Sequence, residues 1–188
     1  RLQAVTRSMW GMPYKLDALG EGKRGRIDRD PTFSLQHLDC VTYLEESFAL
    51  ASRASLPRAI AYTQKLRYLG GVISYRTRKH LPMAQWIPSL TRMGWLKDVT
   101  AEVGGAATQR LVKTIDRRSY STRTGQRFLR RLGRRNIVRG RFALPYLKTA
   151  DAFAAVRRIP PMTLLNVMRA PNPGSPAQIG HVGLVVKV

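Results

Sequence analysis

The chain has 188 residues, 44% of them hydrophobic, and its 33 lysines and arginines against 11 aspartates and glutamates give a formal charge of +22. No apolar run approaches the roughly 20 residues that a membrane-spanning helix needs, so the composition is that of a globular protein with one domain. The single cysteine excludes an internal disulfide bond and a cysteine-rich zinc site. The positive charge favours a polyanionic partner, namely nucleic acid, anionic lipid or an acidic polymer of a cell envelope.

The first well-marked element is a helix over residues 39–54. Leu44 and Phe48 recur at helical spacing, and Asp39 stands where an N-cap residue belongs. The preceding residues 1–38 are rich in Gly, Pro and Asp, which predicts a loop lying over a site or an edge.

The remaining elements follow in chain order. A second helix is predicted over residues 57–69, with a proline in its first turn and "LGG" closing it. The alternating "VISYRTRKH" at residues 72–80 predicts a strand, and residues 81–96 predict a loop with short helical turns. "AEVGGAATQRLVKTI" fits either a helix or a strand, and "TGQRFLRRLGRRNIV" has a helical pattern that Gly133 interrupts. The runs "MTLLNVMRA" and "HVGLVVKV", separated by "PNPGSPAQIG", predict an antiparallel β-hairpin.

Positive charge is concentrated between Val103 and Ala150, where 13 basic residues stand against one acidic residue, Asp116. The segment has neither the regular aromatic residues of a single-strand binding platform nor a recognisable groove-binding motif. A solvated cationic surface is therefore weighed equally against nucleic-acid binding.

Cys40 directly follows the predicted N-cap, and this position has two interpretations. A helix N-terminus favours a thiolate nucleophile through its free N–H groups and its dipole. A lone cysteine is also among the residue types most often buried as core filler. The base for a nucleophile would be His37, His80 or His181. His181 is favoured because "GHVGLVVKV" places it on a rigid strand with glycines beside it, whereas His37 would reach the thiol awkwardly from a loop.

"DC" at a helix start and "HVG" at a strand start resemble motifs of the NlpC-type papain-like cysteine peptidases, which are cell-wall enzymes. The longer segments "PYKLDALGEGKRGRID", "LDCVTYLEESFALA", "LRYLGGVISYRTRKHLPMAQW" and "IGHVGLVV" resemble the N-acetylmuramoyl-L-alanine amidase-like branch of that superfamily. The resemblance covers most of residues 13–100 and 159–187. It implies an α+β papain-like fold in which a helical part carrying Cys40 packs on an antiparallel sheet carrying His181.

The resemblance also implies a reaction. Cys40 matches the nucleophile that attacks the amide carbonyl between N-acetylmuramic acid and L-alanine, and His181 matches the general base. The backbone N–H of Cys40 would help to hold the oxyanion. No metal and no cofactor is implied. Three alternatives remain open: cleavage within the stem peptide, wall binding without catalysis, and nucleic-acid binding.

Four residues match substrate-groove positions of the family: Tyr14, Arg78, His80 and Trp86. Each of the last three also has a structural alternative. Trp86 fits a core aromatic residue, Arg78 a solvated cation, and His80 a residue that holds a loop through a backbone hydrogen bond. Glu46 is expected to pair with a nearby arginine or lysine.

We expect one domain over residues 1–188, with a basic insertion at about 103–145. Papain-like sites orient their histidine with a third polar residue on a later strand, and the chain ends at Val188. The last strands are therefore expected to be missing from the chain. A second departure from the family is "RIPPMTLLNV", where relatives have a Gly-Asp pair before the histidine strand.

Peptidoglycan is the implied partner, and the charge adds anionic envelope polymers, which we favour over nucleic acid. This substrate implies a bacterial periplasmic or cell-envelope location, reached by export or secretion. "RLQAVTRSMWGM" lacks the apolar block of a secretory signal, which indicates another route or a signal already removed. A toxin delivered into a rival's periplasm would fit these features and would imply an immunity protein.

Overall fold

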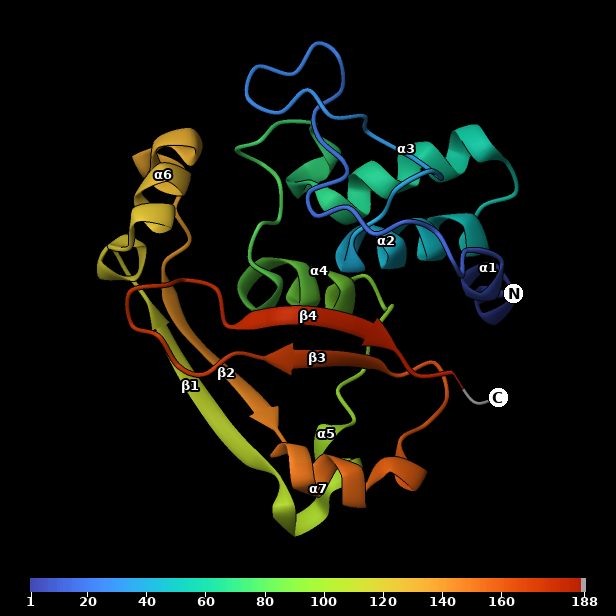
Figure 1. The fold of residues 1–188 in the computed structure, drawn as a ribbon, viewed down its shortest axis with the longest axis vertical. Helices are drawn as coiled ribbons and strands as arrows, with labels where there is room; N and C mark the ends of the chain where they lie inside the picture. The colour runs from blue at the N-terminus through green and yellow to red at the C-terminus, as the bar shows by residue number, and fades with distance from the viewer. Residues whose placement is uncertain (187–188) are drawn as a thin grey trace.

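The computed structural model describes residues 1–186 and shows a mixed α+β domain (Figure 1). This confirms the α+β part of the predicted fold class, while the papain-like topology stays a prediction. In this part of the chain no helix has the length and apolar character needed to cross a bilayer. The strands are β1 (Gln109–Ile115), β2 (Gly140–Tyr146), β3 (Leu164–Met168) and β4 (Ile179–Leu184). The α-helices are α1 (Leu2–Ser8), α2 (Cys40–Ser52), α3 (Leu56–Arg67), α4 (Ile87–Arg92), α5 (Thr100–Gly104), α6 (Arg123–Leu132) and α7 (Thr149–Ala154).

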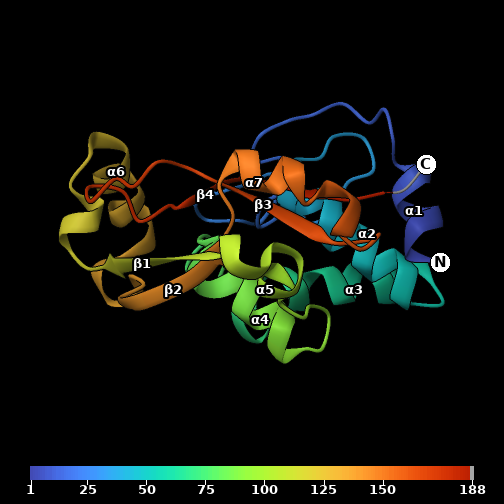
Figure 2. The same cartoon turned by 90° about the horizontal axis from the view of Figure 1, so that it is seen from below.

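The strands form two separate antiparallel pairs. β1 and β2 pair in register from Gln109 opposite Tyr146 to Ile115 opposite Gly140. β3 and β4 form the predicted C-terminal hairpin, with a register shift between Val167 and Met168. Residues 187–188, which the predicted second strand included, lie outside the described part of the chain. The β1–β2 ribbon and α6 lie at one end of the molecule, and α1 to α3 lie at the other (Figure 2).

Helix α2 begins where the sequence predicts, because its N-terminus is doubly capped. Asp39 Oδ1 accepts the backbone N–H groups of Val41 at 3.0 Å and of Thr42 at 2.8 Å. The Thr42 hydroxyl in turn accepts the Asp39 N–H at 2.7 Å, completing a capping box. The predicted second helix is α3, which follows after a short turn with Pro57 at its start.

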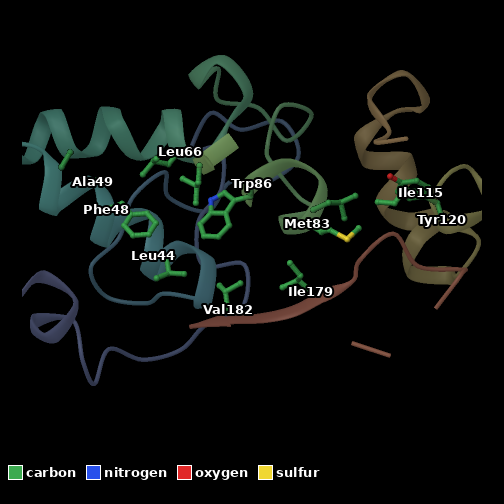
Figure 3. Close-up of a cluster of buried hydrophobic side chains, with 13 residues drawn as sticks. Leu44, Phe48, Ala49, Leu66, Met83, Trp86, Ile115, Tyr120, Ile179 and Val182 are labelled. Atoms are coloured by element: carbon green, nitrogen blue, oxygen red, sulfur yellow. The ribbon is translucent and has the colours of Figure 1, made fainter. Parts of the chain in front are cut away.

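The core lies between α2 and β4 (Figure 3). Leu44 of α2 and Trp86 are completely buried, and Val182 of β4 is 2% exposed. All three belong to one hydrophobic cluster, which also contains Leu66 of α3 and Ile179 of β4. This shared cluster fixes the start of α2 against the second C-terminal strand.

The strand predicted over residues 72–80 is wrong. Its backbone forms turns instead, in which the N–H groups of Thr77 and Arg78 both donate to the Ser74 carbonyl, at 3.1 and 3.0 Å. The only ladder contact is an isolated bridge between Tyr68 and Arg78. Ser and Thr side chains that bond the local backbone compete with strand pairing, and no neighbouring strand is present among the described residues to offset them.

The long loop between α1 and α2 is held by side chains rather than by a ladder. The Tyr68 hydroxyl donates to the Gly20 carbonyl at 2.8 Å, and Gln64 of α3 donates to the Thr32 carbonyl at 3.1 Å. Within the loop, the Glu21 carboxylate accepts the N–H groups of Ile27 and Asp28, both at 2.9 Å. α3 therefore anchors a segment that has almost no regular structure of its own.

One ion pair is fully buried in the helical layer. Arg67 of α3 donates through Nε and Nη2 to Glu45 of α2, both at 2.8 Å, and the two side chains are 5% and 2% exposed. Removing one partner of such a pair leaves a charge or a donor without compensation in the interior.

We expect Glu45→Ala to lower the free energy of unfolding by about 3 to 5 kcal/mol, because it leaves the Arg67 guanidinium buried without its acceptor. Urea denaturation followed by circular dichroism measures this loss. The matched control is Glu102→Ala, which removes an exposed pair with Lys97 and should cost less than about 1 kcal/mol. Equal losses for the two variants would contradict the argument.

Candidate functional site

Cys40 is the first residue of α2 and is a half-buried free thiol that packs against the core cluster. The Asp39 carboxylate takes the N–H groups of the second and third helical residues and leaves the N–H of Cys40 itself uncapped. An N–H at this position can stabilise negative charge that develops beside the thiol. The helix start therefore combines a nucleophilic atom with a potential oxyanion donor.

Tyr14 lies beside Cys40. A parallel bridge joins Tyr14 to Leu38, with the Lys15 N–H donating to the Leu38 carbonyl at 3.1 Å. Partial burial raises the pKa of the Tyr14 hydroxyl, and the neighbouring Cys40 and Asp39 raise it further. The structure thus brings together two of the residues that the sequence analysis selected, a phenol and a thiol.

His181 lies on β4, opposite Val167 of β3, and its side chain is exposed. Val182, the next residue, points into the core toward α2, so strand alternation directs His181 to the other side of the strand. Within residues 1–186 the imidazole forms no hydrogen bond or ion pair. The structure therefore places Cys40 and His181 on two elements that pack together but does not join their side chains.

The other two histidines are placed differently. His37 is exposed in the loop before α2. His80 is largely buried, and its Nε2 lies 2.6 Å from the Tyr75 carbonyl oxygen. Burial lowers the pKa of His80 to about 4, so its imidazole is neutral at pH 7 and Nε2–H is the donor to that carbonyl. This contact is the structural alternative raised for His80.

Arg78 is paired rather than solvated. It bonds the Asp28 carboxylate at 2.5 Å, and both side chains are largely buried. Its guanidinium also lies 5.6 Å from the centre of the Tyr75 ring. Trp86, by contrast, is completely enclosed in the core and offers no surface to a groove. Its position fits the core alternative, since a bulky aromatic ring fills the space between the helical layer and β4 (Figure 3).

A groove of about 810 Å³ lies next to these residues. Arg78 and His80 form its floor, and Phe128 of α6 reaches it from the basic segment, with its ring 4.9 Å from that of His80. The other walls come from the long loop, from α6 with its N-cap residue, and from the connection between β3 and β4. They include, in that order, Asp17, Asp28 and Asp30, then Thr122, Thr124 and Arg131, then Arg169 and Ser175. No sequence pattern indicated α6 or the β3–β4 connection as walls of the groove, because these segments meet only in the folded chain.

Neither Cys40 nor His181 lines the groove, but residues close to their neighbours Tyr14 and Gly180 do. At one end Asp17 follows Tyr14 closely in the chain; burial raises the Asp17 pKa, and the charge of Asp39, the N-cap of α2, adds to the rise. At the other end Arg169 packs over Gly180, the residue before His181. Among residues 1–186 no group of three or more His, Cys, Asp or Glu side chains is arranged to hold a metal ion.

Glu46 differs from its expected role. It is fully buried, and its Oε1 accepts the Ser34 N–H at 3.0 Å, so it holds the loop before Cys40 and does not pair with a cation. The ion pair predicted for Glu46 is formed instead by the preceding residue, Glu45. Burial raises the pKa of Glu46 to about 8. A protonated carboxyl therefore supports the segment that leads into the site.

Comparisons with known proteins agree with this architecture. A family model described as AmiA-like, N-acetylmuramoyl-L-alanine amidase-like, matches residues 4–188. No curated protein matches the sequence significantly. A solved structure from Legionella pneumophila is similar with a TM-score of 0.85 and 21% identity, covering 100% of this chain and 74% of that chain.

Two structures from Bacteroides are also similar. A B. uniformis N-acetylmuramoyl-L-alanine amidase has a TM-score of 0.62 and 20% identity, covering 97% of this chain and 79% of that one. A B. fragilis protein provisionally described as a xylanase has a TM-score of 0.66 and 18% identity, covering 98% and 82%. At these identities the likenesses establish the fold alone.

Glu46 predicts a specific dependence of stability on pH. Its folded-state pKa of about 8 lies above the unfolded value of 4.5, so the folded protein keeps a proton that the unfolded chain releases. The free energy of unfolding should therefore fall as pH rises between these values, by up to about 1.4 kcal/mol per pH unit from this group. Glu46→Gln, which keeps the acceptor for Ser34, should remove that part of the slope.

Urea denaturation of both proteins from about pH 5 to about pH 8 measures the difference between the two slopes. Glu102→Gln, at an exposed carboxylate, serves as the control and should keep the parent slope. Parallel pH profiles for the parent and Glu46→Gln would show that Glu46 ionises normally in the folded protein.

Proposed function

The chain belongs to the AmiA-like, N-acetylmuramoyl-L-alanine amidase-like family, and from this premise we propose that it is a cysteine-dependent peptidoglycan hydrolase that cleaves the amide between N-acetylmuramic acid and L-alanine. The observation that carries the proposal is the start of α2. There a free thiol, the Cys40 N–H group that Asp39 leaves without a cap, and the Tyr14 hydroxyl meet. The arrangement suits acyl transfer through a covalent intermediate.

The proposed reaction proceeds in two steps. His181 takes the thiol proton as the Cys40 sulfur attacks the amide carbonyl carbon, and the Cys40 N–H donates to the oxyanion. The C–N bond then breaks, the L-alanine nitrogen leaves with the proton from His181, and a thioester remains on Cys40. Water next attacks the thioester, giving up a proton to His181, and the thiol and the muramic acid carboxylate are released.

One feature of the fold supports these roles, and a second places a condition on them. α2 packs on β4, so nucleophile and base are carried by one packed unit, as in the papain-like superfamily in which we place the chain. The His181 imidazole forms no hydrogen bond among residues 1–186, and strand alternation directs it away from the core side of β4. The proposed reaction therefore requires a local rearrangement of β4 or of the start of α2 to bring the imidazole to the thiol when substrate binds. Tyr14 would then orient the thiol or the carbonyl group, and Arg78 and His80 would line the groove for the peptide.

The basic surface supports an anionic environment for the enzyme, which we place in the bacterial periplasm or cell envelope. Its members are all exposed, and none forms an ion pair within residues 1–186. Arginine forks match phosphate and carboxylate groups well. We define this surface by Arg110, Arg117, Arg118, Arg123, Arg127, Arg130, Arg131, Arg134, Arg135, Arg139 and Arg141.

Digestion of purified peptidoglycan, followed by mass spectrometry of the products, tests the reaction. The parent protein should release stem peptides that begin with L-alanine, and Cys40→Ala and His181→Ala should each lower the rate by at least about a thousandfold. His37→Ala is the matched control, because its side chain is exposed and takes no part in the mechanism. Products cut within the stem would identify an endopeptidase, and full activity of Cys40→Ala would exclude the cysteine mechanism.

The basic surface predicts salt-dependent binding to an anionic polymer. Retention of Cys40→Ala on immobilised lipopolysaccharide should weaken steeply with sodium chloride concentration, and Arg127→Gln combined with Arg134→Gln should reduce the logarithmic salt slope by about two. Duplex DNA provides the comparison. Stronger binding to DNA, together with no release of stem peptides by the parent protein, would favour the nucleic-acid-binding alternative.

A further inference from the structure

The charges that line the groove are unevenly neutralised. Asp28 is paired with Arg78, and Asp30 lies 3.5 Å from Lys15. Arg131 and Arg169 line the same groove, and within residues 1–186 neither has a carboxylate partner. Arg29 and Asp17 also line the groove without an ion-pair partner among these residues, so its unpaired charged groups are three guanidinium groups against one carboxyl group.

Arg169 is held in place by its surroundings. Its backbone N–H donates to the Gln178 carbonyl at 2.8 Å, and the buried Gln178 side chain donates back to the Arg169 carbonyl at 2.6 Å. Its side chain then lies across Gly180, where a Cβ atom would approach Arg169 Nε to 2.7 Å. The absence of a side chain at residue 180 lets the arginine take this path across the hairpin, and no counter-charge accompanies it there among residues 1–186.

Arg131 is positioned by the docking of α6. Phe128, one turn earlier, packs its ring 4.9 Å from His80 and 6.2 Å from Tyr75. Arg131 lies on the same side of the helix and hydrogen-bonds the Tyr75 side chain, which helps to lower the Tyr75 pKa against the rise caused by burial. Arg127 and Arg130 lie on the same helix, are exposed and do not line the groove.

From these observations we infer that Arg131 and Arg169 bind carboxylate groups of the peptide part of the substrate and so select acidic stem peptides over amidated ones. The inference rests on the proposed function for the identity of the ligand. Two arginines on separate elements suit a ligand with two carboxylates, because each guanidinium can donate two parallel hydrogen bonds to one of them. The basic segment, which the sequence analysis treated as an insertion, would then bind the stem peptide through Arg131.

Titration calorimetry with the Cys40→Ala protein tests the inference without cleavage. The probes are N-acetylmuramoyl-L-alanyl-D-glutamate, which has two free carboxylates on its peptide, and its bis-amide. The acid should bind at least about tenfold more tightly than the amide, and Arg131→Gln and Arg169→Gln should each weaken binding of the acid about tenfold. Neither substitution should change binding of the amide.

Arg127→Gln and Arg130→Gln carry the same charge change on the same helix and should leave both affinities unchanged. Equal binding of acid and amide, no binding of either, or equal losses in these controls would overturn the inference. The amidase proposal is judged separately from the products that the parent protein releases from peptidoglycan. Release of stem peptides without the arginine effect would reject only the inference, whereas the arginine effect without release would reject only the amidase.

Discussion

The packing of α2 against β4 is the contact on which the rest of the structure depends. Leu44, Trp86 and Val182 meet in one cluster, and the two residues proposed for catalysis lie next to it in the chain. Cys40 stands one helical turn before Leu44, and His181 directly precedes Val182 in the strand. A core contact of this kind sets the positions of both backbones while leaving the two reactive side chains at its edge, where a substrate can reach them.

Two buried carboxyl groups of α2 stabilise the position of this helix. In a chain with a charge of +22, two adjacent carboxyl groups are buried in α2, and each has a different partner. Glu45 bonds Arg67 of α3, which joins the two helices, while Glu46 bonds the Ser34 N–H, which joins α2 to its own preceding loop. Burial raises the pKa of both groups, and the coulombic effect of Glu45 adds to the rise at Glu46. Glu45 thus joins α2 to α3, and Glu46 holds the loop that leads to Cys40.

The sequence patterns predicted those elements whose formation depends on residues close together in the chain. The capping pattern at Asp39 located the start of α2, and apolar runs separated by turn residues located the C-terminal hairpin. The strand predicted over residues 72–80 was wrong because Ser74 and Thr77 satisfy the local backbone. β2, which contains a glycine, a proline and an arginine, has a weak strand pattern and forms where β1 pairs with it.

For the candidate site, motifs in the sequence selected residues but did not predict the shape of the groove. Tyr14, Cys40, Arg78 and His80 were selected from motifs, and the structure places Tyr14 beside Cys40 and the other two in the groove. The parts that were missed, Arg131, Phe128 and Arg169, reach the groove from segments far away in the chain. Such contacts depend on long-range packing, which no local pattern encodes. The placement of His80 and Trp86 could be offered only as alternatives, because residue type alone does not distinguish a wall from a core.

The anchoring of the long loop by α3 has a consequence for the motions of the site. Tyr14 reaches Cys40 from a segment whose carbonyls at Gly20 and Thr32 accept hydrogen bonds from Tyr68 and Gln64. The loop has little ladder structure, so fraying of the C-terminal end of α3 would loosen the parts of the loop near Gly20 and Thr32, while the Asp28–Arg78 pair and the Ser34–Glu46 hydrogen bond still held the rest. Changes at the end of α3 would then alter the surroundings of the Cys40 thiol, although α3 contributes no residue to the groove.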